Sequence, residues 1–134
     1  MRRGGLERHG RDGLRIRLES GPGAAAQARS ELAKLCADLD PPLMETLRLL
    51  VTELVTNSVR HTDGDSVTLQ VAVGSSAVLT EVADAGPSFD PDCVDKRGSD
   101  GYGWGLFLVQ RLSQRWGVKN DGGSKRVWFE LARV

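Results

Sequence analysis

Apolar and polar residues alternate from Val67 to Val73, and a Gly74-Ser75-Ser76 turn leads into a second run from Ala77 to Ala83. The apolar positions of the first run are Val67, Leu69, Val71 and Val73. A period of two is typical of strands with one buried face, and a short turn between two strand-length runs joins antiparallel neighbours. The pattern therefore predicts an antiparallel hairpin, so the fold must contain a sheet.

Two more strands and three helices are predicted around this hairpin. Leu14, Ile16 and Leu18 alternate with charged residues in a first strand, and Val127, Phe129 and Leu131 alternate in a last one. Helical spacing of apolar residues predicts helices from Ala24 to Asp38, from about Pro42 to Arg60, and from about Leu106 to near Trp116-Gly117. The predicted fold class is α+β, a two-layer sandwich of about three helices on one mainly antiparallel sheet.

Length and composition favour a single domain. Residues 1–12 are rich in Gly and Arg and are expected to form a flexible tail, and residues 13–134 are expected to form one domain. Acidic and basic residues balance at 18 each, which disfavours direct binding to nucleic acid or to a membrane surface. Only two cysteines occur, far apart, which favours a reducing cytoplasm.

The second predicted helix carries a carboxylate and an amide one turn apart, Glu53 and Asn57. At about 100° per residue, both lie on the flank of an apolar stripe that should face the sheet. Asn57 offers a neutral oxygen that suits Mg²⁺, and Glu53 is placed to orient or deprotonate a nucleophile. The alternative is an ordinary solvated polar edge.

Two further segments have the residue types of a ligand site. Gly101, Gly103 and Gly105 alternate just before the third helix, at the end of a long loop predicted from Gly86 to about Gly103. Such a backbone can approach a phosphate, although a flexible hinge has the same composition. Asp84 ends the second hairpin strand and is placed either to accept a hydrogen bond from an exocyclic amine or to cap a turn.

Together these motifs resemble, in type and order, those of the GHKL ATPases. The matching boxes are Glu53 to Asn57 followed by His61-Thr62, then Asp84-Ala85-Gly86, then Gly101 to Gly105, within residues 14–134. The resemblance implies the Bergerat-type ATP-binding fold, with ATP and Mg²⁺ as cofactors. It implies a catalytic Glu53, a magnesium ligand in Asn57, and nucleotide contacts from Asn57, His61, Asp84, Gly86, Gly101, Gly103, Gly105, Leu106 and Ser124.

Within that superfamily, the short chain and the segment from Gly103 to Val109 are similar to anti-sigma factor serine/threonine kinases of the actinobacterial type. This resemblance implies transfer of the ATP γ-phosphate to a Ser/Thr of an anti-anti-sigma (STAS-type) partner, which controls the availability of a sigma factor. A homodimer is left open. The family's Gly-Lys-Thr-like segment is Ser124-Lys125-Arg126-Val127 here, so we expect Arg126 in place of the threonine, with Ser124 as its substitute if the register shifts.

Two other functions remain open. One is a non-catalytic ATP-binding module, or a nucleotide-independent one, that acts by sequestering a partner; the change at Arg126 favours it. The other is a stand-alone catalytic domain of a two-component histidine kinase. That function needs a separate phosphoacceptor, because no histidine-bearing helical hairpin precedes the ATPase region.

Overall fold

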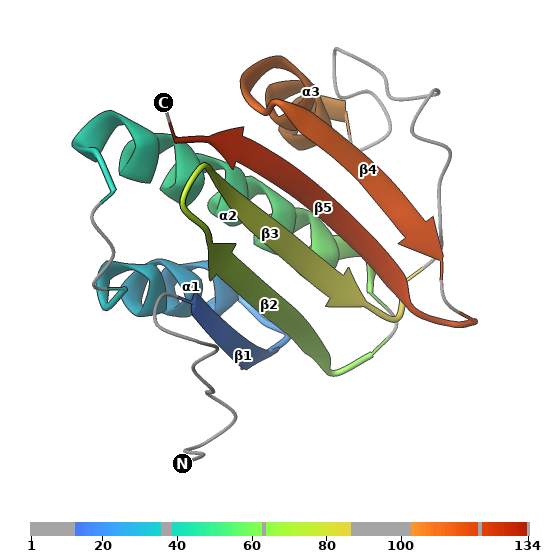
Figure 1. Cartoon of the computed structure of the whole chain (residues 1–134). Coiled ribbons are helices and arrows are strands. Elements are labelled where there is room, and N and C mark those ends of the chain that lie inside the picture. The colour runs from blue at the N-terminus through green and yellow to red at the C-terminus, as the bar shows by residue number, and fades with distance from the viewer. Residues whose placement is uncertain (1–12, 36–38, 63, 87–102, 121, 134) are drawn as a thin grey trace.

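Five strands and three helices make up the described part of the protein in a computed structural model (Figure 1). The structure describes residues 13–35, 39–62, 64–86, 103–120 and 122–133, without the side chains of 103 and 104. In chain order the elements are β1 (Gly13–Glu19), α1 (Ala24–Ala33), α2 (Pro41–His61), β2 (Ser66–Val73), β3 (Ala77–Asp84), α3 (Gly103–Leu112), β4 (Arg115–Asn120) and β5 (Lys125–Ala132). The tail predicted for residues 1–12 lies outside this description.

One antiparallel sheet contains all five strands, in the order β1-β2-β3-β5-β4. The predicted hairpin is β2 and β3, and its turn is closed by a 2.8 Å hydrogen bond from the Gly74 amide to the Ala77 carbonyl. The turn between β4 and β5 contains Gly122 and Gly123, whose positive φ angles of 51° and 97° favour glycine. Because β5 pairs with both β3 and β4, the chain crosses over between β3 and β5.

The helices form a second layer against one face of the sheet (Figure 1). Helix α2 contacts β2, β3 and β5 and lies between α1, which contacts β1, and α3, which contacts β4. It begins with two prolines in its first turn, where no helical hydrogen bond is lost. Its buried face is the predicted apolar stripe, with Val55 and Asn57 added: Leu47, Leu50, Val51, Leu54, Val55, Asn57 and Ser58.

The hydrophobic core fills the space between the two layers. The strands bury alternate residues, such as Val67, Leu69 and Val71 of β2, and α2 contributes leucines and valines at helical spacing. These observations confirm the predicted α+β two-layer architecture. None of the helices in the described chain is long and apolar enough to span a membrane.

Three predicted helix boundaries are wrong. The third helix begins at Gly103 rather than Leu106, so Gly103 and Gly105 lie in its first turn instead of before it. The first helix ends at Ala33 rather than Asp38, because the Lys34 and Leu35 amides bond to carbonyls three residues back in a tightened last turn. The third helix ends at Leu112, so Trp116 and Gly117 lie in β4. We expected no strand there, because β4 is a six-residue edge strand with little apolar alternation.

Candidate functional site

Glu53 and Asn57 lie one turn apart on α2, as their spacing predicts. Glu53 is half-buried, whereas Asn57 is only 8% exposed and is turned further inward than the predicted flank position. The Asn57 Nδ2 atom is buried and has no hydrogen-bond partner within the described residues. Because an unsatisfied buried donor typically costs about 1–3 kcal/mol, the site gains if a ligand supplies an acceptor there.

Gly105 brings the first turn of α3 directly against this pair of side chains. A Cβ added at position 105 would lie 2.7 Å from Asn57 Nδ2, and 3.3 Å from both Cβ and Oε1 of Glu53. Real Cβ atoms essentially never approach a neighbour to under 3.0 Å, so a side chain at position 105 would force the Asn57 amide or the two helices to shift. The Glu/Asn box and the glycine box therefore meet in space.

The other glycine-box residues are placed less completely. Gly103 is the first residue of α3, and Gly101 lies outside the described residues. Leu106 is 1% exposed and belongs to the hydrophobic core, so its side chain anchors α3 to the rest of the domain. A helix N-terminus with a glycine in its first turn offers backbone amides and partial positive charge to an anion.

Asp84 ends β3 and caps the turn that follows it. Its Oδ1 accepts a 2.6 Å hydrogen bond from the Gly86 amide, which is the turn-capping role weighed for an Asp-x-Gly sequence. Gly86 in turn packs on the end of α2, where an added Cβ would lie 2.6 Å from the His61 carbonyl oxygen. The Asp84 side chain is fully buried, so its second oxygen, Oδ2, also faces the protein interior.

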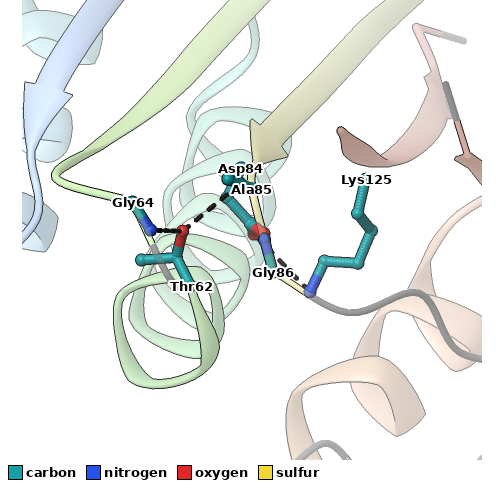
Figure 2. Close-up of polar contacts among 6 residues, drawn as sticks. All are labelled: Thr62, Gly64, Asp84, Ala85, Gly86 and Lys125. Carbon is teal, nitrogen blue, oxygen red and sulfur yellow. Dashed lines mark hydrogen bonds and ion pairs between the residues drawn. The ribbon is translucent and has the colours of Figure 1, made fainter. Parts of the chain in front are cut away.

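Thr62 ties the end of α2 to the same turn (Figure 2). Its Oγ1 accepts hydrogen bonds from the amides of Gly64, at 3.1 Å, and Ala85, at 3.3 Å. His61 is the last residue of α2 and is half-buried beside Gly86. The His61-Thr62 pair thus positions the Asp84-Ala85-Gly86 turn against α2.

Lys125 is the site residue that sequence reasoning missed. It begins β5 directly opposite Asp84 in the sheet register, and its Nζ lies 3.5 Å from Asp84 Oδ2 (Figure 2). Both side chains are buried, at 2% and 0% exposure. Burial lowers the pKa of the Lys125 ammonium from its ordinary value of 10.5, and the negative charge of Asp84 opposes part of that effect.

The contact between Lys125 and Asp84 is an ion pair rather than a well-formed hydrogen bond. Its 3.5 Å length exceeds the usual hydrogen-bond range, and Asp84 Oδ2 makes no hydrogen bond among the described residues. Oδ2 therefore keeps the capacity to accept one from another donor.

Arg126 does not stand beside Asp84, contrary to the expectation that it replaces a base-pocket threonine. It pairs with Ala83 in the register, so its side chain is on the opposite face of the sheet, where Nη1 lies 3.3 Å from Glu81 Oε1. Ser124 is half-buried just before β5. The residue of this segment that lies opposite Asp84 is thus Lys125.

The residues present fit a nucleotide at two places. Around Gly105, an unsatisfied amide, a half-buried carboxylate and a helix N-terminus are suited to phosphates and a divalent cation. Around Asp84, a buried carboxylate oxygen with spare hydrogen-bonding capacity is suited to an amine donor. Lys125 is the feature that does not fit directly, because its ammonium lies against that oxygen.

The resemblance to the GHKL ATPases is confirmed by comparison with known proteins. A family model described as "Histidine kinase-like ATPase domain" matches residues 18–131, and the chain belongs to this family. No curated protein matches the chain.

Solved structures share the fold at low sequence identity. The RsbU and RsbW domains of Rv1364c from Mycobacterium tuberculosis match with a TM-score of 0.69 at 19% identity, over 91% of this chain and 33% of that chain. The Erythrobacter litoralis EL346 blue-light activated histidine kinase matches with a TM-score of 0.57 at 25% identity, over 88% of this chain and 42% of that chain. The Acinetobacter baumannii histidine kinase AdeS matches with a TM-score of 0.52 at 15% identity, over 67% of this chain and 47% of that chain. The chain thus spans less than half of each.

Proposed function

We propose that this chain binds Mg-ATP and transfers the γ-phosphate to a serine or threonine of an anti-anti-sigma (STAS-type) protein in the cytoplasm, thereby controlling a sigma factor. The observation that carries the proposal is the contact of Gly105 with Glu53 and Asn57, which brings two boxes of the ATPase family together. The likeness to a structure that includes an RsbW domain supports the regulatory branch.

Each side chain has a distinct role in this proposal. Asn57 offers a neutral oxygen to Mg²⁺, and the amides at the start of α3 bind phosphate oxygens. Glu53, half-buried beside Gly105, orients the substrate hydroxyl and accepts its proton. Asp84 accepts a hydrogen bond from the exocyclic amine of the base. Mg-ATP supplies the phosphoryl group, and positioning together with charge neutralisation does most of the catalysis.

The binding step is tested by calorimetric titration of the protein with ATP and Mg²⁺, and by thermal unfolding in the same mixtures. A ligand at 100 times its Kd stabilises the folded state by about 2.7 kcal/mol, so saturating Mg-ATP should raise the melting temperature by several degrees. Asn57→Ala should abolish most of the heat of binding and most of the increase in melting temperature. Absence of saturable binding by the wild type at millimolar ATP would contradict the proposal unless removal of the Lys125 ammonium restores it.

The transfer step is tested with labelled ATP and a candidate STAS-type protein. The wild type should label the partner on a serine or threonine, and the phosphoester should survive acid, whereas phosphohistidine is lost in acid. Glu53→Gln keeps the shape of the side chain but cannot accept a proton, so it should bind ATP and transfer slowly. Equal transfer by wild type and Glu53→Gln would remove Glu53 from its role.

A second candidate is a module that sequesters a partner without transferring phosphate. The observation that favours it is the buried Lys125 ammonium on Asp84, which competes with recognition of a base. The module would bind the STAS-type protein or the sigma factor equally well with and without Mg-ATP. Affinity measured in both conditions, together with the transfer assay, separates the two functions.

A further inference from the structure

Asp84 is fully enclosed by the protein, although the proposed function needs it to meet a base. Its Oδ1 is held by the Gly86 amide at 2.6 Å, and its Oδ2 faces the Lys125 ammonium at 3.5 Å. With 0% of its side chain exposed, no donor from outside can reach the carboxylate unless a neighbouring group moves. One of the two contacts must therefore open first.

The Gly86 contact is the harder of the two to open. Gly86 is fixed by its backbone, which packs on the His61 carbonyl so closely that an added Cβ would lie 2.6 Å away. Thr62 also binds the amide of Ala85 in the same turn. Moving the Gly86 amide away from Oδ1 would disturb all of these backbone contacts.

The Lys125 contact is the easier one to open. The side chain is a flexible four-carbon stem with a strongly hydrated head, so rotation about its own bonds can move the ammonium away from Asp84. The ion pair is long. A buried ammonium also bears a large desolvation cost, and the return of the ammonium to water would remove that cost. Its departure would leave Oδ2 in need of a donor.

We propose that Lys125 Nζ occupies, in the nucleotide-free protein, the place beside Asp84 Oδ2 that the exocyclic amine of the base takes, so that base binding replaces a long ion pair with a hydrogen bond. Lys125 thereby makes the affinity for nucleotides with amine-bearing bases lower than it would be without the ammonium. This inference rests on the proposed function, because it assumes that Asp84 reads the base.

The first test measures nucleotide affinity after the competing donor is removed. Lys125→Met keeps most of the stem and deletes the ammonium, so ATP should bind at least about tenfold more tightly, the worth of one charge-assisted hydrogen bond. Purine riboside 5′-triphosphate, which has no exocyclic amine, should bind wild type and variant alike. The matched control is Lys119→Met on neighbouring β4, an exposed lysine whose loss removes the same charge and should not tighten ATP binding.

A second test uses the wild-type protein and needs no variant to fold. Amine acetylation followed by mass spectrometry reports how accessible each lysine is. Lys125, which is 1% exposed, should react slowly in the free protein and faster when Mg-ATP is bound, the reverse of the protection that ligands usually give. Lys119, already exposed, should react at the same rate in both states.

The outcomes separate the inference from the proposed function. Equal or weaker ATP binding by Lys125→Met, beside a wild type that binds ATP, would overturn the inference and leave the function standing. Unchanged or slower acetylation of Lys125 in the ATP-bound protein would do the same. Binding by neither protein would overturn both, and binding by Lys125→Met alone would support the exchange in its strongest form.

Discussion

At the scale of single residues, Gly105 sets how closely α3 approaches α2. A helix interior normally gains about 0.5–1 kcal/mol when glycine becomes alanine. Here the added methyl would meet Asn57 Nδ2 at 2.7 Å and Glu53 at 3.3 Å, so the helices must separate or both side chains must move. The steric cost of such overpacking is typically about 1–3 kcal/mol and outweighs the gain in helix propensity.

Gly105→Ala is therefore expected to lower the free energy of unfolding and to weaken Mg-ATP binding, because the methyl displaces the Asn57 amide. Urea denaturation and calorimetry measure the two effects. The control is Gly21→Ala, at a glycine with no atom within 4 Å of an added Cβ, which should change stability by less than about 0.5 kcal/mol. A Gly105→Ala protein as stable as the wild type, with full affinity, would show that α3 does not bind α2 this tightly.

At the scale of an element, α2 both carries the site and anchors it to the core. Its inward face contacts three strands and includes Asn57, while Glu53 lies on its half-buried flank and Thr62 follows its last residue. The site residues are held in place because the apolar face of the same helix is fixed in the core.

Two adjacent leucines of α2 test how much of this anchoring comes from burial. Leu50 is 0% exposed, and Leu49 is 41% exposed. Leu50→Ala should destabilise the protein by about 2–5 kcal/mol through lost burial and a cavity. Leu49→Ala should change stability by less than about 0.5 kcal/mol. Chemical denaturation of both variants checks the difference, and similar losses at the two positions would mean that the helix faces are assigned wrongly.

At the scale of the whole molecule, the buried lysine couples global stability to alkaline pH. The pKa of Lys125 is lowered in the folded protein, whereas the unfolded chain keeps the proton up to about 10.5. Between the lowered pKa and 10.5 the unfolded state binds more protons, so the contribution of Lys125 to the free energy of unfolding increases as pH rises. Burial of the charged form therefore costs most at neutral pH.

Lys125→Met lacks this titrating group, so its stability relative to the wild type should decrease as pH rises through that window. Urea denaturation at steps from neutral pH to about 10.5 measures the difference. Lys119→Met should follow the wild type throughout, because that lysine is exposed. A difference between Lys125→Met and wild type that is constant with pH would mean that Lys125 keeps its ordinary pKa.

The two layers of this fold could be predicted from the sequence, whereas strand β4 at the edge of the sheet could not. Strand β2 and the apolar face of α2 were predictable because burial imposes clear periods of two and 3.6 residues, and β3 was predictable from the short turn that follows β2. Strand β4 at the sheet edge has exposed ends and a central Gly117, so no such period arises. Its pairing with β5 is a tertiary effect.

The sequence motifs of the site could be predicted, but the distances between their residues in the fold could not. The meeting of Gly105 with Asn57 depends on helix packing, which spacing along the chain does not encode. Lys125 was overlooked because lysine is normally exposed. The signal was nevertheless present: Lys125 is in phase with Val127, Phe129 and Leu131, the buried positions of β5, and the period of two therefore turns it inward.

The crossover that places β5 beside β3 has a consequence for synthesis of the chain. Ribosomes release residues in order, so Asp84 and the end of α2 emerge well before the strand that carries Lys125. Until that strand docks, the nascent domain has an unpaired edge along β3 and an uncovered carboxylate at its end. A chaperone or a binding partner that recognises an open strand edge would therefore meet this protein during the interval before β5 closes the sheet.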